Sequence, residues 1–157
     1  MAKLFCVSDT HSHYTPLKKA LDEAGFDPTN EGHYLISLGD AFDRGPESKE
    51  VLKFLMSLKR KILVKGNHDK HSCEAFMKVF DFACDSFTMD YMGINIIFTH
   101  KPLKRFSQDV NIHGHLHDKP ALRDKRHILI SLEKMGYCVF PLKGIIKKWK
   151  KLNMEGC

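Results

Sequence analysis

The densest group of reactive side chains lies between residues 39 and 46, directly after an apolar run. Asp40, Asp43 and Arg44 stand there between two glycines, Gly39 and Gly45. An apolar run that ends in Gly-Asp is typical of a buried strand that delivers a carboxylate to the edge of an α/β sheet, where such folds bind ligands. Glycine allows the backbone to turn tightly at such a point. The alternative is a surface turn with a local ion pair between Asp43 and Arg44.

Side chains that can bind metals or transfer protons also follow other apolar runs. They are Asp9, His11, Asn67, His68, His100, His115 and His117. Oxygen and imidazole ligands without thiolate suit Mn, Fe, Zn, Co or Ni. A single catalytic ion with an open position needs only about three protein ligands. The larger set therefore predicts two divalent metal ions that share a carboxylate.

The elements that must position these residues alternate between strands and helices in the first half of the chain. We predict strands over residues 3–7, 34–38 and 62–64, and helices over residues 16–24, 51–58 and 72–83. Thr15 is expected to cap the first helix, Pro16 to open it and Gly25 to end it. This order is the βαβ pattern, which predicts parallel strands whose loops share one edge of a sheet.

The second half of the chain has the pattern of short strands followed by one helix. We predict strands over residues 87–91, 94–99 and 110–113, a final pair over 127–132 and 137–140, and a helix over 142–152. Apolar residues form one stripe of that helix and lysines the other, which favours packing on a sheet over a role at a membrane or on nucleic acid. We expect one domain over residues 1–157, an α/β fold in which two-layered mixed β-sheets, a β-sandwich, are flanked by α-helices.

The composition is that of a globular protein: of 157 residues, 43% are hydrophobic and 28% charged. No apolar run reaches the length of a membrane span, and the first residues lack a secretory signal, so we expect a cytoplasmic protein with no membrane partner. Five cysteines without a C-x-x-C pair argue against a disulfide framework or a zinc ribbon. The net charge of +6 favours polyanionic partners such as nucleotides, phosphoproteins or nucleic acid.

Five blocks of the sequence together resemble the motif set of the calcineurin-like metallophosphoesterase superfamily. The blocks are Asp9-x-His11, Gly39-Asp40-x-x-Asp43-Arg44-Gly45, Gly66-Asn67-His68-Asp69, Thr99-His100 and Gly114-His115-x-His117. The resemblance implies that Asp9, His11 and His117 bind one metal ion, that Asn67, His100 and His115 bind the other, and that Asp40 bridges them. It implies the fold of that superfamily, Mn²⁺ as the expected metal, and a bridging hydroxide as the nucleophile.

The resemblance also implies roles for three residues beside the ions. His68 would be the general acid that protonates the leaving oxygen. Asp43 would hold the imidazole of His68, and Arg44 would bind two phosphoryl oxygens with its planar fork. Where the phosphoprotein-phosphatase and diadenosine-tetraphosphatase branch usually has glutamate after Gly-Asn-His, this chain has Asp69.

The expected function is hydrolysis of phosphate esters, as a phosphomonoesterase or nucleotide pyrophosphatase. The substrate would be a phosphorylated small molecule, a nucleotide or a phosphoprotein, and no obligate protein partner is evident. One alternative is a phosphodiesterase acting on cyclic nucleotides or nucleic acid, which the small size and the basic charge favour; the Gly-His-Leu-His ending resembles that of small phosphodiesterase-type members of the superfamily. The other is a metal-bound scaffold without catalysis.

The remaining histidines match no ligand position of the motif set. They are His13, His33, His71, His113 and His127. We treat them as ordinary surface or core residues, except that His71 follows the Gly-Asn-His-Asp loop and is a candidate to reach the substrate. Phe76, Phe80, Phe82 and Phe87 are expected in the core.

Overall fold

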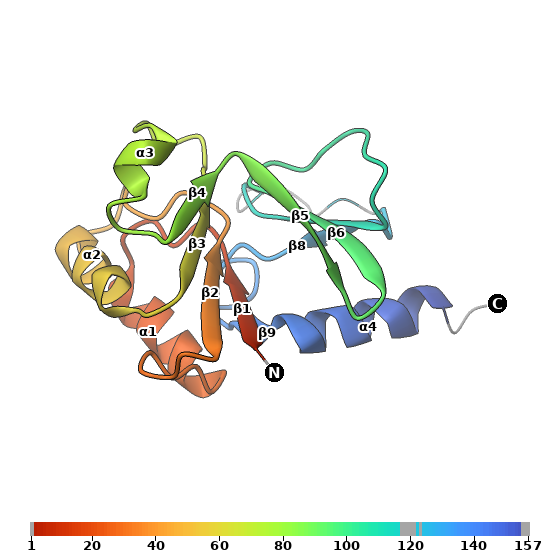
Figure 1. The fold of residues 1–157 in the computed structure, drawn as a ribbon, viewed down its shortest axis with the longest axis horizontal. Helices are drawn as coiled ribbons and strands as arrows, with labels where there is room; N and C mark the ends of the chain where they lie inside the picture. Colours follow the sequence, from red (N-terminus) through yellow and green to blue (C-terminus); the bar gives the residue numbers. More distant parts are fainter. Residues whose placement is uncertain (1, 117–121, 123, 155–157) are drawn as a thin grey trace.

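The computed structural model describes residues 2–116, 122 and 124–154 (Figure 1). The helices are α1 (Tyr14–Glu23), α2 (Ser48–Ser57), α3 (Cys73–Phe76) and α4 (Leu142–Met154). The strands are β1 (Lys3–Val7), β2 (His33–Ser37), β3 (Lys61–Val64), β4 (Phe82–Cys84), β5 (Ser86–Tyr91), β6 (Ile94–Thr99), β7 (Val110–His113), β8 (His127–Leu129) and β9 (Phe140–Pro141). Among the described residues no helix is long and apolar enough to cross a membrane.

The strands form two mixed sheets. The first has the order β4-β3-β2-β1-β9, with β1 to β4 parallel and β9 antiparallel to β1. The second has the order β5-β6-β7-β8, in which the β5–β6 hairpin is antiparallel and β6, β7 and β8 run parallel. The predicted parallel βαβ arrangement of the first strands is confirmed, and so is the fold class of two mixed sheets with flanking helices.

The first sheet is buried on both faces, which explains why its strands are continuous apolar runs. Phe5 and Val7 belong to one core, which they form with residues of α1, α2 and α3. Leu4 and Cys6 alternate with them along β1 and belong to a second core, shared with β6, β7 and α4. Side chains of a strand point alternately to its two faces. The result is a layer of helices, two stacked sheets, and α4 beneath them (Figure 1).

Several expected elements differ in the structure. The helix predicted over residues 72–83 ends at Phe76, because residues 82–84 form β4 and pair with β3 at the edge of the sheet. The carboxylate of Asp81 accepts the backbone N–H of Lys61 at 2.7 Å and helps to direct the chain into that strand. Phe82 is consequently 48% exposed, whereas Phe76 and Phe80 are in the core as predicted.

Two further local predictions were wrong. His13 rather than Thr15 is the cap residue of α1. The Thr15 hydroxyl and backbone N–H instead bind the carboxylate of Glu47, which explains why this threonine does not cap the helix. The last two strands are not a pair: β8 extends the second sheet beside β7, and β9 pairs with β1 in the first sheet.

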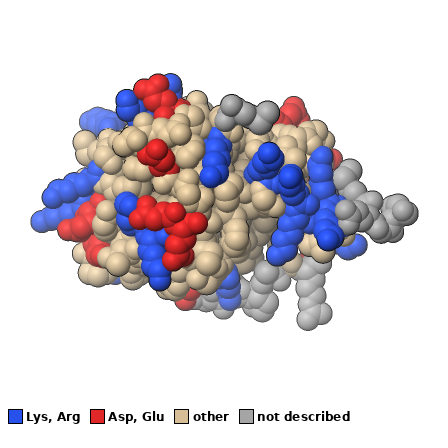
Figure 2. All heavy atoms as spheres, turned by 90° about the horizontal axis from the view of Figure 1, so that it is seen from below, with Lys and Arg blue, Asp and Glu red and all other residues tan. Residues whose placement is uncertain are grey.

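The terminal helix α4 packs its apolar stripe on the sandwich. Leu142 and Ile146 are fully buried in the second core, whereas Leu152, predicted on the same stripe, is 66% exposed. Lysines 143, 147, 148 and 151 are exposed, and the face seen in Figure 2 gathers blue side chains over α4. The packing predicted for this helix is thus confirmed along most of its length.

Candidate metal centre

The site lies where loops from both sheets meet at one edge. These loops follow β1, β2 and β3 in the first sheet and β6 and β7 in the second. Backbone hydrogen bonds join the first two loops: the N–H of Asp9 donates to Gly39 at 3.1 Å, and the N–H of His11 donates to Asp40 at 2.9 Å. The N–H of Gly114 donates to the carbonyl of His100 at 3.0 Å and joins the loops of the second sheet. Parallel strands therefore bring the predicted residues together.

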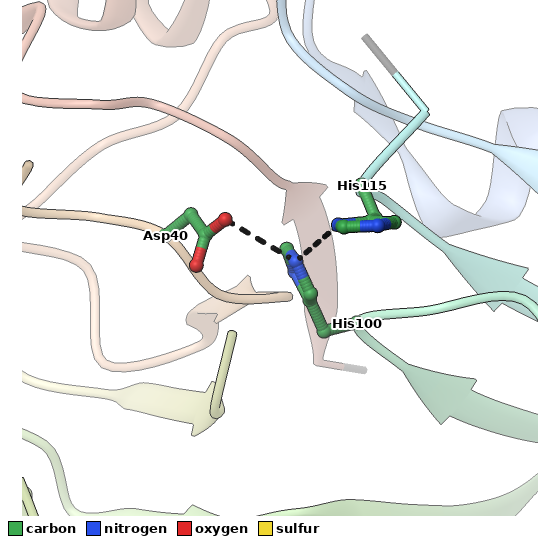
Figure 3. Close-up of side chains that lie close together, drawn as sticks. All are labelled: Asp40, His100 and His115. Carbon is green, nitrogen blue, oxygen red and sulfur yellow. Dashed lines mark hydrogen bonds and ion pairs between the residues drawn. The ribbon is translucent and has the colours of Figure 1, made fainter. Parts of the chain in front are cut away.

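Asp40, His100 and His115 form the first group of metal-binding side chains (Figure 3). Their ligand atoms all lie within 4.8 Å of one another. Nε2 of His100 is 3.3 Å from a carboxylate oxygen of Asp40 and 3.2 Å from Nδ1 of His115. The amide oxygen of Asn67 lies 3.0 Å from the same Nε2. Four predicted ligands therefore converge on one point.

The protonation of this group favours a cation at its centre. Nδ1 of His100 lies 2.7 Å from the carbonyl oxygen of Leu38, which can only accept, so Nδ1 carries a hydrogen. Nε2 can then carry at most one more hydrogen, yet it faces the oxygens of Asp40 and Asn67 and a nitrogen of His115. One proton can satisfy only one such neighbour, whereas a divalent ion can accept lone pairs from all of them. These residues fit a metal ion.

Electrostatics within the group are consistent with ligand chemistry. Burial raises the pKa of Asp40, but its hydrogen bonds with His100 and the backbone N–H of His68 outweigh that effect and bring the pKa to about 2, so the carboxylate stays ionised. Burial lowers the pKa of His100, but the hydrogen bond and charge of Asp40 raise it overall. Burial and the neighbouring His100 lower the pKa of His115, which keeps that imidazole neutral and able to donate a lone pair.

Asp9, His11 and Asp40 form a second group whose ligand atoms also lie within 4.8 Å of one another. One oxygen of Asp9 accepts the backbone N–H of His115 at 2.9 Å. The other, Oδ1, is buried, has no hydrogen-bond partner among the residues that the structure describes, and lies 4.0 Å from Nε2 of His11. Burial of a carboxylate oxygen reduces the stability of a fold unless the oxygen accepts a hydrogen bond or binds a cation. Asp40 belongs to both groups, as a bridging ligand would.

Beside these groups, Asp43 connects two histidines and an arginine. One carboxylate oxygen of Asp43 lies 2.6 Å from Nδ1 of His11. The other lies 3.1 Å from Nδ1 of His68 and 3.2 Å from Nε of Arg44. Nη2 of Arg44 is in turn 2.8 Å from Nε2 of His68. The sequence predicted the contact with His68 but missed the one with His11, which presents Nε2 of that ring toward Asp9.

Asp69 is a second residue whose role sequence reasoning missed. It is buried, and one of its oxygens accepts the backbone N–H groups of Asp40, at 2.9 Å, and Gly66, at 2.8 Å. Asp69 therefore joins the loop after β2 to the loop after β3. Gly66 is required at this contact, because a Cβ atom there would overlap the carboxylate of Asp40. The only signal in the sequence was the aspartate that follows Gly-Asn-His.

The site residues adopt an uncommon backbone conformation. Positive φ angles occur at Asp9 (54°), His11 (43°), Asp40 (54°), Arg44 (68°) and His115 (70°). Left-handed conformations are uncommon for residues other than glycine and cluster at functional sites. The loops are held in this form by the backbone hydrogen bonds and by Asp69.

Two cavities open beside Arg44 and His68. One, of about 240 Å³, is lined by Asp9, Thr10, His11, His13, Arg44, Leu132, Glu133 and Tyr137. The other, of about 430 Å³, is lined by Phe42, Asp43, Leu52, His68, Asp69, Lys70, His71, Ala75, Phe76 and Val79. The arrangement leaves room for a ligand on each side of the group formed by Asp43, Arg44 and His68.

The remaining predicted residues fall into three groups. His117 lies outside the described residues. His71, the candidate for reaching the substrate, and His13 line the two cavities. His33 packs against Phe5, and His113 is fully buried. Burial lowers the pKa of His113 to about 4, as expected for a neutral core histidine.

The chain combines an α/β fold of two sheets with oxygen and imidazole ligands gathered at one sheet edge. This combination is typical of metal-binding α/β proteins. A model of the calcineurin-like phosphoesterase family matches residues 2–151. The chain belongs to this family, and members of the family use divalent metal ions.

Individual relatives share parts of the sequence or the fold. A symmetrical bis(5'-nucleosyl)-tetraphosphatase of Pseudomonas fluorescens is 43% identical over 68 residues, which cover 43% of this chain and 23% of the relative. One from Proteus mirabilis is 38% identical over 76 residues, 48% of this chain and 27% of the relative. The matched segment therefore spans only about a quarter of these curated relatives.

Solved structures with the same fold cover more of the chain. A protein of unknown function from Aquifex aeolicus superimposes with a TM-score of 0.69 at 23% identity, covering 94% of this chain and 99% of the other. A phosphoesterase from E. coli gives a TM-score of 0.57 at 20% identity, covering 82% and 78%. At this identity the likeness concerns the fold.

Proposed function

We propose that this chain is a metal-dependent phosphoesterase that hydrolyses nucleotide polyphosphates or phosphate monoesters. The observation that carries the proposal is the pair of ligand groups that share Asp40, next to the contacts among Asp43, Arg44 and His68. Two ions that share a carboxylate are a recurrent arrangement in hydrolysis of phosphate esters. Membership of the calcineurin-like phosphoesterase family supports the same reaction class.

In the proposed centre, Asp40 would be the ligand shared by two ions, because it belongs to both groups. Asp9, His11 and His117 complete one ligand set, and Asn67, His100 and His115 complete the other. Oxygen and imidazole donors without thiolate support Mn²⁺, with Fe, Zn, Co or Ni as competitors. When bound, the ions supply Lewis-acid activation of water and of the phosphoryl group.

The protein side chains have separate tasks in the proposed reaction. Arg44 binds two phosphoryl oxygens through its planar guanidinium. Nδ1 of His68 donates to Asp43, so Nε2 is the atom that transfers a proton to the leaving oxygen. In the structure this Nε2 faces Nη2 of Arg44 at 2.8 Å, so a phosphate that draws Arg44 away leaves Nε2 able to carry the proton.

Two features support a nucleotide polyphosphate or monoester over a diester. A phosphate monoester or terminal phosphate has three non-bridging oxygens, so it can offer two to the guanidinium of Arg44 and keep one for the ions, whereas a diester has only two in all. The curated relatives from Pseudomonas fluorescens and Proteus mirabilis, which the chain matches in part, carry the name of tetraphosphatases.

A substrate comparison tests this function. The purified protein is assayed with Mn²⁺ against diadenosine tetraphosphate, p-nitrophenyl phosphate and bis-p-nitrophenyl phosphate. We expect turnover of the first two, loss of activity with EDTA, and recovery with added Mn²⁺. Turnover of the diester alone would contradict the proposal in favour of a phosphodiesterase. Bound metal without turnover of any substrate would favour a scaffold.

A further inference from the structure

The cavity of about 430 Å³ beside His68 lies between α2, α3 and the loops after β2 and β3. Phe42 comes from the loop after β2, Leu52 from α2, and Phe76 from α3, while His68 and Asp43 form its boundary with the candidate metal centre. Its volume is in the range of pockets that bind small ligands. Because His68 and Asp43 are among its lining residues, the cavity adjoins the proposed catalytic group.

The walls of this cavity are aromatic and apolar. The rings of Phe42 and Phe76 are nearly parallel, at 8°, with centroids 6.4 Å apart. The imidazole of His71 meets Phe76 edge-on at 6.0 Å. Leu52 is 37% exposed, whereas Val51 and Leu55 on the same helix are buried in the core. An apolar surface of this kind next to a polar site is characteristic of ligand binding.

One lysine, Lys70, lies at the rim of the cavity. Lys70 and His71 are exposed there, and both line the cavity. Carboxylates line both cavities, Asp43 and Asp69 the first and Asp9 and Glu133 the second, so the two differ in their apolar walls rather than in charge. A ligand with an aromatic end and a phosphate chain is more complementary to the first cavity, where the phenylalanine rings lie near Lys70.

The position of His68 indicates which part of a substrate the cavity receives. A general acid must lie within hydrogen-bond reach of the leaving oxygen, so the leaving group extends on its side of the phosphorus. We propose that the cavity is the leaving-group subsite and that it binds the base of a nucleotide against Phe42, Leu52 and Phe76, with the phosphates of that nucleotide toward Lys70 and His71. The assignment rests on the function proposed above.

Nucleotide binding to the Mn²⁺-loaded protein tests the subsite. The probes are ADP and inorganic pyrophosphate, which share a diphosphate but differ in the base. Stacking of one base on aromatic side chains predicts that ADP binds roughly 5- to 150-fold more tightly than pyrophosphate in isothermal titration calorimetry. Equal affinities of the two probes would overturn the proposal.

Variants on α2 and α3 locate the effect. Leu52→Gln replaces an apolar wall, and Ala75→Trp fills the cavity from α3; each should reduce the preference for ADP over pyrophosphate toward unity. Met56→Gln is the matched control, because Met56 lies on the same helix, is 61% exposed and does not line the cavity. If the Leu52 and Met56 variants changed the preference for ADP over pyrophosphate equally, the base would bind elsewhere. The same conclusion would follow if a folded Ala75→Trp protein kept the wild-type preference.

Turnover separates this inference from the proposed function. Diadenosine tetraphosphate and inorganic tripolyphosphate are hydrolysed in parallel by the same variants, and Leu52→Gln should raise KM for the dinucleotide alone. Absence of turnover for both substrates would contradict the proposed function, while the binding preference for ADP would still decide the role of the cavity. If the protein bound a phosphopeptide, lost that binding in the Leu52 variant and showed no preference for ADP, the cavity would serve a protein substrate instead.

Discussion

Replacing Asp43 by asparagine should impair metal binding and turnover together. Asp43 accepts from Nδ1 of His11 with one oxygen and from Nδ1 of His68 with the other, at 2.6 and 3.1 Å. Asparagine has the same shape but offers one acceptor oxygen and one NH₂ group. The two imidazoles therefore cannot both donate to it. One of them must either lose the hydrogen bond or move its hydrogen to Nε2.

The magnitude follows from which histidine is affected. If His11 carries its hydrogen on Nε2, that atom can no longer bind a metal, and loss of such a supporting carboxylate typically costs about 10- to 100-fold in metal affinity or activity. If His68 is affected, the orientation of the general acid is lost, and kcat falls by up to roughly 10²- to 10⁴-fold. We expect weaker binding of one ion and a lower kcat that excess Mn²⁺ restores only in part.

Metal titration and steady-state kinetics measure the two effects separately. Inductively coupled plasma mass spectrometry gives the metal content at limiting Mn²⁺, and kcat is taken at saturating Mn²⁺. Asp22→Asn is a suitable control, because Asp22 is exposed and pairs with Lys18 on α1. Wild-type metal content and wild-type kcat in Asp43→Asn would refute the role assigned to this carboxylate.

Other perturbations act on single parts of the site. His68→Ala should lower kcat by roughly 10²- to 10⁴-fold with metal content unchanged, because the backbone N–H that binds Asp40 remains; loss of metal would make His68 a ligand. Gly66→Ala should reduce metal binding, measured by the same titration, because its Cβ overlaps the Asp40 carboxylate; normal binding would contradict that contact. Asp40 raises the pKa of His100. In metal-free protein, the pair of protonated His100 and Asp40 therefore stabilises the fold fully at a pH below the ordinary pKa of histidine. This stabilisation is lost as the pH rises through the raised pKa of His100. Mn²⁺ must displace that proton, so it should raise Tm more near pH 8 than near pH 6; the opposite order would exclude His100 as the competing group.

The sequence predicted much of the fold because local patterns and global packing agree there. The apolar runs before Asp9, Asp40 and Asn67 became parallel strands, and parallel strands must deliver their following residues to one edge. The region after residue 72 was mispredicted for the opposite reason. Its helical spacing continues to Ala83, but backbone pairing of residues 82–84 with the open edge of β3 outweighs local helix propensity.

The site was less predictable where it depends on contacts between loops. The pairing of Asp43 with His11 joins residues 32 positions apart, and nothing in their local sequence selects it over a pairing with His68 alone. Asp69 contacts two backbone N–H groups, which carry no side-chain signature. The apolar cavity lies between α2, α3 and the loops after β2 and β3, and no periodicity in the sequence specifies how these parts are placed relative to one another.

The left-handed backbone at the site residues bears on how this protein could evolve. Each such residue other than glycine costs about 1 kcal/mol or more, and a typical domain has only about 5–15 kcal/mol of net stability. Mutation without selection for chemistry would therefore drift toward glycine at Asp9, Asp40 and His115. Among relatives of this fold, replacement of those residues should mark lineages that have given up metal chemistry and kept the domain for another purpose.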